Sequence, residues 1–347
     1  MTKMLEIDGS QKSGSGTILR LSVALSAINQ EPLHIYNIRH NRKQPGLRPQ
    51  HLESIIAATK LCNAETKGVE LDSHELWFKP DTITGGEVTA EIGTAGSIPM
   101  LLLTVLPICA YAKQPCKVHV MNGGTDVRYA PTINYIKHVM LPVLEEMGLK
   151  ASITVKKYGY YPKGMGEIVL NVNPVSTLQP INLTEFGAIT EIEGISVCTF
   201  LEKQKVAQRQ AQKAANSLEN CGYKTNIQVL NDYSNRFQKG SSITLWAKTS
   251  KGALIGADAI GEKRKTSEAV GQEAAENLLK EIQANAPVDV HLADMLVPYV
   301  GLANGQSAYF VRKITDHIQT NIWLMEKILG IKIKVEPLDA GFLVRKL

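Results

Sequence analysis

The order of short β-branched runs and helix-length amphipathic stretches recurs along the chain, and this recurrence limits the folds that the chain can adopt. One copy covers residues 4–79, a second covers residues 88–172, and the second half of the unit returns over residues 318–345. The first two copies read as strand, helix, strand, helix and then two strands, an order that packs as layers. The sequence therefore predicts an α+β fold in which three repeated β-α-β-α-β-β units form a large domain.

The expected elements are bounded by Gly, Pro, Asn and Asp residues. In the first copy we expect strands at residues 4–8, 33–38, 69–71 and 75–79 and helices at 18–28 and 49–61. In the second we expect strands at 88–92, 117–121, 152–157 and 167–172 and helices at 98–109 and 131–147. The last copy has a helix at 318–329 and strands at 332–335 and 341–345. The text of residues 69–72 is matched by that of residues 335–339, so both are expected to form the same hairpin.

The segment between the second and third copies breaks the repeat. It reads as strands at residues 191–199, 225–230, 242–247 and 253–256 with one helix at 204–220. Because the third unit resumes afterwards, we expect a smaller α/β domain inserted in that unit. In the predicted division, residues 1–183 and 260–347 form the large domain, and residues 184–259 form the insert.

Composition excludes several classes of protein. Hydrophobic residues make up 44% of the chain and charged residues 20%, which suits a chain with a buried core. The longest apolar run, residues 98–112, is shorter than the roughly 18–20 residues of a membrane span and contains Pro107. Residues 1–8 have no apolar signal-peptide core. The five cysteines show no CxxC spacing, so we expect no structural zinc, no disulfide-linked partner and a reducing cytoplasmic location.

A glycine- and serine-rich turn separates the first expected strand from the first expected helix. Residues 8–16 read Asp-Gly-Ser-Gln-Lys-Ser-Gly-Ser-Gly, and Arg20 follows one turn into the helix. Such a turn brings backbone N–H groups to an anion at a helix N-terminus, although plain turn chemistry explains the same residues. Arg20 is expected either to point back at this pocket or to lie on the solvated face.

The densest basic cluster of the chain lies between residues 39 and 51. Its candidate phosphate- or RNA-binding residues are Arg39, Arg42, Lys43, Gln50 and His51, on a backbone stiffened by two prolines and a glycine. Guanidinium forks beside an amide and an imidazole suit phosphate and sugar contacts. A solvated charged face is the alternative interpretation. The net charge of +5 permits an anionic partner without requiring one.

Two further segments contain polar residues at helix starts. Residues 122–128 place Asp126 after a strand, where it could cap the next turn. His317 follows an aspartate at the start of a helix, where a neutral imidazole could act as nucleophile or base. A structural role is the alternative for any single histidine. No histidine pair has metal-ligand spacing, which argues against a zinc site.

Taken together, these segments resemble the RNA 3′-terminal phosphate cyclases. The matching stretches follow the family's order and are residues 8–10 with 18–20, 39–51, 92–97, 123–126, 160–166, 261–264, 292–294 and 317–321. The resemblance covers nearly the whole chain. It implies a three-unit α+β body with an inserted smaller domain, which agrees with the repeat.

The resemblance also implies an activity and its residues. His317 matches the family histidine that attacks the α-phosphate of ATP, and the resulting histidine–AMP activates an RNA 3′-phosphate that closes to a 2′,3′-cyclic phosphodiester. The implied enzyme is an ATP-dependent, AMP-forming ligase of RNA processing, with ATP and RNA 3′ ends bearing a phosphate as its partners. A divalent cation, Mg²⁺ or Mn²⁺, is implied as well. The residues matching the ATP site are His291, Leu292, Ala293, Asp294, Met295 and Arg20.

This chain departs from the family pattern at several polar positions. Ser13 stands where the family usually has a glutamate, and Thr17 and Leu103 stand where it has glutamines. His291 and Met295 replace the tyrosine and glutamine that usually begin and end the nucleotide segment, so no metal ligand is assigned. These changes motivate an alternative, a catalytically impaired cyclase-like RNA-binding factor in RNA or ribosome maturation. An unrelated α+β enzyme with a similar repeat is a third interpretation.

Overall fold

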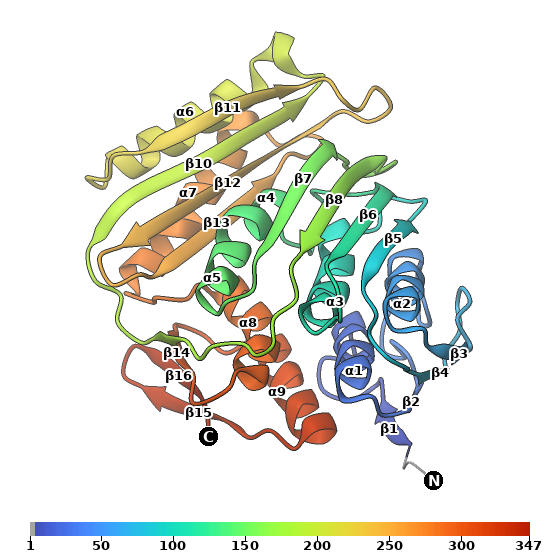
Figure 1. Ribbon diagram of the computed structural model, residues 1–347. Coiled ribbons are helices and arrows are strands. Elements are labelled where there is room, and N and C mark those ends of the chain that lie inside the picture. Colours follow the sequence, from blue (N-terminus) through green and yellow to red (C-terminus); the bar gives the residue numbers. More distant parts are fainter. Residues whose placement is uncertain (1–3) are drawn as a thin grey trace.

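The computed structural model describes residues 4–347; residues 1–3, part of the stretch read as lacking a signal peptide, lie outside the described residues. The chain is a mixed α+β protein, as the sequence predicts, with its strands in four four-stranded sheets. Figure 1 shows the sheet of β10–β13 at the top, that of β5–β8 in the middle and those of β1–β4 and β14–β16 at the bottom. No helix among residues 4–347 has the length and apolar character needed to cross a bilayer.

The first sheet has the order β1-β2-β4-β3. Its strands are β1 (Leu5–Asp8), β2 (Leu33–Tyr36), β3 (Glu65–Lys67) and β4 (Leu76–Lys79), and its helices are α1 (Gly16–Asn29) and α2 (Pro49–Cys62). The β1–β2 pair is parallel and the other two pairs are antiparallel. A parallel pair needs a crossover connection, which α1 supplies.

Two other sheets pair their strands in the same pattern. The second, β5-β6-β8-β7, contains β5 (Gly86–Glu91), β6 (Cys116–Gly123), β7 (Ala151–Lys157) and β8 (Gly166–Val172), with α3 (Ile98–Ala110), α4 (Ile133–Tyr135), η1 (Ile136–Met140) and α5 (Leu141–Glu146). The third, β9-β14-β16-β15, contains β9 (Asn182–Leu183), β14 (Ala308–Val311), β15 (Ile333–Leu338) and β16 (Gly341–Lys346), with α8 (Val290–Leu302) and α9 (Asp316–Leu329). In each sheet the first pair is parallel and the others are antiparallel.

The fourth sheet has the different order β11-β10-β12-β13 and its own hydrophobic cluster. Its elements are β10 (Ile189–Thr199), η2 (Glu202–Gln204), α6 (Val206–Glu219), β11 (Asn226–Asp232), β12 (Gly240–Thr249), β13 (Leu254–Ile260) and α7 (Ser267–Gln283). Helix α7 packs against α6, β12 and β13, so this packed segment continues past residue 259, where the sequence placed the end of the insert. The division of the chain into two domains stays a prediction.

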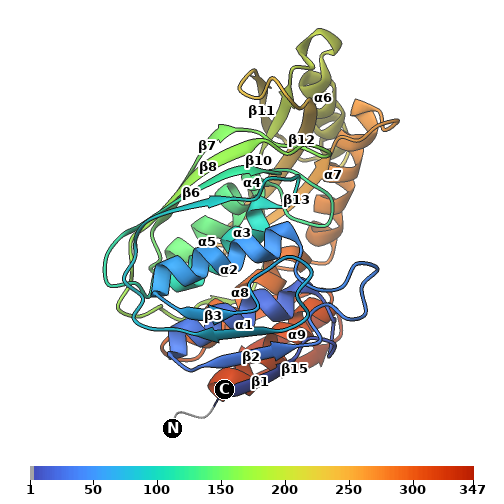
Figure 2. The same cartoon turned by 90° about the vertical axis from the view of Figure 1, so that its right-hand side faces the viewer.

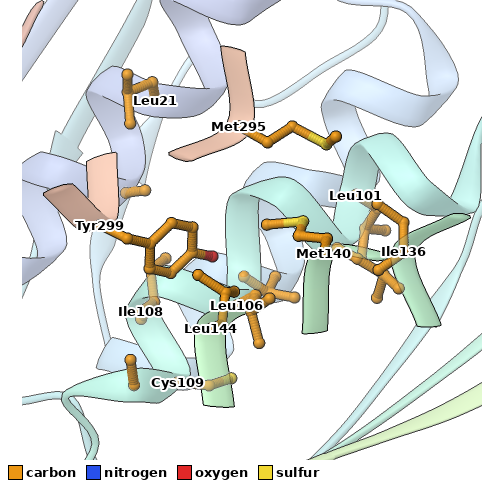
Figure 3. Close-up of a cluster of buried hydrophobic side chains, with 14 of the residues drawn as sticks. Leu21, Leu101, Leu106, Ile108, Cys109, Ile136, Met140, Leu144, Met295 and Tyr299 are labelled. Atoms are coloured by element: carbon orange, nitrogen blue, oxygen red, sulfur yellow. The ribbon is translucent and has the colours of Figure 1, made fainter. Parts of the chain in front are cut away.

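The main hydrophobic core is formed by the helices and by the faces of the sheets that they cover. Figure 2 shows α2 and α3 between the β5–β8 sheet and the β1–β4 sheet. In Figure 3, Leu21 of α1, Leu106 of α3, Met140 of η1, and Met295 and Tyr299 of α8 gather in one apolar cluster. Burial of such side chains contributes about 1.5–3 kcal/mol each relative to exposure, so this cluster fixes how α8 sits against α1 and α3.

Two predicted elements are wrong in detail. Residues 69–71 form no strand: the backbone of Asp72 and Ser73 bonds instead to that of Leu47, in the basic segment, and β3 forms at 65–67. The expectation that residues 69–72 and 335–339 form the same hairpin is therefore wrong, since residues 335–338 belong to strand β15 and residues 69–72 belong to no strand.

The helix expected at residues 131–147 is interrupted by the π-helical turn η1. Pro142 lacks an N–H, and the N–H of Leu141 donates to the carbonyl of Ile136, five residues back.

Candidate active site

His317 lies at the start of α9, two residues after the N-cap Thr315, and its side chain is exposed. Its Nδ1 atom is 3.2 Å from Oγ1 of Thr17 on α1, which brings residues 300 positions apart into contact. Partial desolvation of the ring and the positive charges of Arg20 and Arg42 lower the pKa of His317. The imidazole is therefore neutral near neutral pH and keeps a free electron pair.

The glycine- and serine-rich turn wraps around the same helix start. The backbone N–H of Ser13 donates to Oγ1 of Thr320 at 3.2 Å, and the hydroxyls of Ser13 and Ser15 are 2.9 Å apart. Arg42 donates to the backbone carbonyls of Ser13 and Gly14, at 3.1 and 3.4 Å. The basic loop, the turn and the start of α9 therefore meet around His317.

Arg20 is buried beside this contact. Its exposed fraction is 9%, and its Nη2 atom lies 3.5 Å from the hydroxyl of Thr17. Burial and the nearby Arg39 lower the pKa of Arg20 to about 10, and no carboxylate in the described chain offsets this. A buried guanidinium is usually paired with an anion, so this one indicates a site for an anionic ligand.

His51 lies next to Arg20 at the first turn of α2. Burial and the charges of Arg20, Arg39 and Arg48 lower the pKa of His51 to about 2, so the ring is neutral. Its Nδ1 accepts the backbone N–H of Arg48 at 3.3 Å. Gly16 leaves room for both side chains: a Cβ there would lie 2.3 Å from His51 Nε2 and 2.7 Å from Arg20 Nη1.

The other basic-segment candidates have different surroundings. Arg39 donates to the carbonyls of Gln44 and Gly46, both at 2.8 Å, and so holds the loop in shape. Gln50 accepts the backbone N–H of Ser97, the N-cap of α3, at 2.7 Å. Lys43 is exposed. Arg39 and Gln50 are therefore engaged in supporting the loops, whereas Lys43 is open to solvent.

The nucleotide segment predicted from the resemblance forms the first turns of α8. The side chains of Leu292, Ala293 and Met295 are buried in the main core, so their role in nucleotide binding stays a prediction. His291 is exposed, and Asp294 is partly exposed. These two are the residues of the segment that present polar side chains toward the surface.

Asp294 joins α8 to the start of α9. Its carboxylate accepts a hydrogen bond from the Thr315 hydroxyl, and its carbonyl accepts one from Asn321 at 2.8 Å. Burial raises the pKa of Asp294 to about 6, against the opposing effect of the Thr315 bond. Asp294 therefore positions the helix end that carries His317.

The described residues do not fit a protein-built cation cage. No group of three His, Cys, Asp or Glu side chains among residues 4–347 is arranged to hold a metal ion. Ser13, where the family usually has a glutamate, contacts Ser15 instead. A hydroxyl is a weaker ligand for Mg²⁺ than a carboxylate, so Ser13 does not replace the metal ligand that a glutamate would supply.

Sequence reasoning missed two residues of this site. The sequence marks Thr17 only as a departure from the family pattern, because its contact with His317 depends on the packing of α1 against α9. Thr315 is not among the residues expected from the sequence, although a threonine just before a helical run is a typical N-cap signal.

Comparison with known proteins shows which family the chain belongs to. The family model for RNA 3′-terminal phosphate cyclase matches residues 11–335. A protein of that name from Pyrobaculum neutrophilum is 40% identical over 340 residues, 98% of this chain and 97% of the relative. One from Pyrobaculum aerophilum is 42% identical over 94% of this chain and 93% of its own. One from Methanopyrus kandleri is 38% identical over 96% of this chain and 95% of the relative. The chain therefore belongs to the RNA 3′-terminal phosphate cyclase family.

Proposed function

We propose that the protein converts an RNA 3′-terminal phosphate to a 2′,3′-cyclic phosphodiester at the expense of ATP. The observation that carries this proposal is the buried Arg20, which has no carboxylate partner in the described chain and is joined through Thr17 to the neutral His317. A cationic pocket next to a nucleophile suits a reaction that attacks a phosphate.

The first step forms a bond between His317 and AMP. The electron pair on Nε2 attacks the α-phosphorus of ATP, the bond to the β-phosphate breaks, and pyrophosphate leaves with its electron pair. This requires the tautomer with the proton on Nδ1, and Thr17 Oγ1 lies where it can accept that proton's hydrogen bond. Arg20 and Arg42 supply positive charge for the developing negative charge.

Two further steps complete the reaction. An oxygen of the RNA 3′-phosphate attacks the phosphorus of histidine–AMP, the P–N bond breaks, and RNA(3′)pp(5′)A forms. The vicinal 2′-OH then attacks the terminal phosphorus of the RNA, loses its proton, and displaces AMP. The route makes physical sense because a terminal phosphate is a poor electrophile until it carries a leaving group.

In the proposed reaction, ATP binds to the protein together with its divalent cation. His291 and Asp294, at the start of α8, are the proposed contacts to the nucleotide, and the 3′-phosphate is placed by Arg42, Lys43 and the neighbouring basic segment. Mg²⁺ or Mn²⁺ would arrive as the counter-ion of the triphosphate, since Mg²⁺ commonly keeps its waters and the substrate phosphates as ligands.

The test is transfer of label from α-³²P-ATP to the protein with Mg²⁺ or Mn²⁺. We expect one labelled, acid-labile and base-stable adduct on the wild-type protein, as for a phosphoramidate, and none on His317→Ala. His138→Ala removes a histidine on η1, outside this cluster, and should label normally. An unlabelled wild-type protein with both cations would refute the enzyme proposal.

The alternative function is a cyclase-like RNA-binding factor. Ser13, Thr17, Leu103 and Met295 favour it, because none offers the carboxylate or amide that the family pattern has there. The retained His317 argues against it. Salt-dependent RNA binding without any labelled adduct would support this alternative.

A further inference from the structure

Four aromatic side chains are exposed on loops that the proposed chemistry does not use. The exposed fractions are 94% for Tyr129, 78% for Tyr161, 55% for Tyr233 and 67% for Phe237. No other Phe, Tyr or Trp side chain among the described residues is exposed to this extent. Single exposed aromatic side chains are common on protein surfaces. A set of them on neighbouring loops indicates a binding site, and aromatic rings suit a ligand with flat apolar faces.

The same loops carry exposed cations. Lys163, Arg236, Lys239, Lys263 and Arg264 are exposed, and none forms an ion pair within residues 4–347. The nearby carboxylates are occupied: Glu262 pairs with Arg128, and Asp232 accepts the hydroxyl of Thr199 at 2.7 Å. The loops therefore present unbalanced positive charge beside the aromatic rings.

Specific bonds hold the loop after β7 to the loop after β11. Asn235, which is buried, donates from Nδ2 to the carbonyls of Tyr158 and Gly164, at 2.7 and 3.1 Å. The backbone N–H of Lys163 donates to Gln238 at 3.2 Å. Tyr161 and Phe237 are thus carried by loops that are fastened together.

The loop after β6 joins the same group. The backbone N–H groups of Thr125 and Asp126 both donate to the carbonyl of Gly159, at 2.8 and 3.1 Å. The Arg128–Glu262 pair fastens it to the loop before α7. We call residues 128–130, 160–163, 233–239 and 262–264, on these four joined loops, the aromatic–basic surface.

Tyr129 has a backbone that a bulky residue seldom adopts. Its φ angle is +64°, in the left-handed region, while its ring is almost fully exposed. The conformation costs about 1 kcal/mol or more, and the exposed ring returns nothing to the packing. The ring of Tyr129 is therefore open to contact with a ligand.

A series of contacts links the basic segment to the loops of the aromatic–basic surface. Gln50, in the basic segment, accepts the N–H of Ser97, and the N–H of Gly124 donates to the carbonyl of Gly96 at 2.8 Å. Gly124 precedes the loop of Tyr129, and a Cβ on Gly164 would lie 2.7 Å from the carbonyl of Thr94. These contacts place the loops that follow β5, β6 and β7 next to one another and next to the start of α2.

We propose that the aromatic–basic surface binds single-stranded RNA upstream of the 3′-terminal phosphate, with bases stacked on the exposed rings and phosphates beside the cations. This inference rests on the proposed function only in taking RNA as the substrate. Stacking tolerates any base sequence, because every base has an aromatic face. Duplex RNA does not offer its base faces, so the surface selects unpaired ends.

The test is binding of a fluorescent single-stranded RNA of about 12 nucleotides that ends in a 3′-hydroxyl and cannot react. In one variant, Tyr129→Asn, whose new residue tolerates a left-handed backbone, is combined with Phe237→Ala; in another, Lys163→Ala is combined with Lys263→Ala. Leu338→Ala on β15 and Lys224→Ala, before the start of β11, are the matched controls, since both positions are exposed.

We expect the aromatic variant to weaken RNA binding at least about tenfold, as loss of stacked bases does. The lysine variant should lower the slope of log Kd against log salt by about 1.4, or 0.7 for each lost phosphate contact. The controls should bind as the wild type does. Unchanged affinity and salt slope in both variants, or equally tight binding of a duplex of the same length, would overturn the proposal.

Labelling by α-³²P-ATP, measured without RNA on the same variants, separates the two proposals. Normal labelling with unchanged RNA affinity refutes the aromatic–basic surface alone. Absence of labelling on the wild type refutes the cyclase proposal, while weakened RNA binding by the aromatic variant would still support the surface.

Discussion

The hydroxyl of Thr17 lies where it can fix the tautomer of the His317 imidazole. Histidine attacks through one ring nitrogen only when the other holds the proton, and Thr17 is the partner of that other nitrogen. Arg20 lies 3.5 Å from the same hydroxyl, so the oxygen is already oriented by a cation. Thr17 is therefore a positioning residue in the proposed reaction, although the resemblance had marked it only as a departure.

We expect Thr17→Val to slow the labelling of His317 by ATP about tenfold, the effect of one lost hydrogen bond of roughly 1–1.5 kcal/mol. Valine keeps the shape of threonine but lacks the hydroxyl. Thr17→Ser restores the hydroxyl and should label at nearly the wild-type rate. The measurement is single-turnover adduct formation at saturating ATP.

A merely structural role for Thr17 would give a different pattern. Valine and serine variants would then label at the same rate, with any loss explained by equal changes in the free energy of unfolding. A slower valine variant with unchanged stability and an unchanged ATP concentration at half-saturation would match the positioning role.

At the scale of elements, the N-terminus of α8 connects three parts of the molecule. Its N-cap Asp289 is buried and accepts the backbone N–H groups of His291 and Leu292, both at 3.0 Å. The same carboxylate accepts the hydroxyl of Tyr135 on α4 and the N–H of Gly256 on β13, at 2.9 Å for the latter. One side chain thus caps a helix and joins the fourth sheet to the rest of the chain.

We expect Asp289→Ala to lower the free energy of unfolding by about 3 kcal/mol, because it removes a helix cap and leaves buried donors without acceptors. Urea denaturation followed by circular dichroism measures this change. Asp339→Ala, at an exposed position, is the control and should change stability by less than about 0.5 kcal/mol. Equal stability of the two variants would show that the cap and its bonds contribute nothing.

The elements show which features local patterns can predict. Helix α2 and strand β8 begin or end within a residue of their expected positions, because their apolar periodicity is strong and prolines or glycines mark their ends. Helix α7 had no counterpart among the expected elements. Its buried face is built largely of small residues such as Ala274 and Ala275, which give a weak hydrophobic signal. Strand β3 lies in residues with no buried side chain, so its position depends on pairing with β4.

The site could be predicted only in part from the sequence. A histidine at a helix start and a basic cluster are visible in the text, and the structure brings His317 and Arg42 to the same place. The burial of Met295 and the contact of Thr17 with His317 depend instead on how α1, α8 and α9 pack. Such contacts between distant segments leave no trace in local periodicity.

At the scale of the whole molecule, two buried carboxylates lie where the fourth sheet meets the segment that follows β6. Asp126 is 1% exposed, and burial raises its pKa to about 7. Burial also raises the pKa of Asp258 on β13, which accepts the N–H of Thr132 at 2.7 Å. Each of these groups repels the other when ionised, so the junction is sensitive to pH.

The protein should therefore lose stability as pH rises from about 4 to about 7. Asp126 titrates near 3.8 when unfolded and near 7 when folded, so its favourable contribution is complete below the lower value and lost above the higher one. The loss from this residue is at most about 4 kcal/mol. Urea denaturation at a series of pH values measures it.

Asp126→Asn should reduce this pH dependence. An amide can donate to Thr125 Oγ1, whose hydroxyl then turns toward the carbonyl of Gly159 at 3.2 Å, so the bonds are kept without the charge. Asp339→Asn should leave the pH dependence as in the wild type. A variant at Asp126 with the full wild-type slope would show that this carboxyl does not titrate between the two states.

The bonds of Asp289 to Gly256 and Tyr135 have a consequence for substrate length. They tie the fourth sheet to the helices, and Asn235 ties the loop of Phe237 to the loop of Tyr161. These bonds restrict movement of the aromatic–basic surface relative to the helices. On the proposed binding mode, affinity should therefore depend on RNA length. It should rise with each added nucleotide until the strand reaches from His317 to the aromatic–basic surface, and further nucleotides should add little.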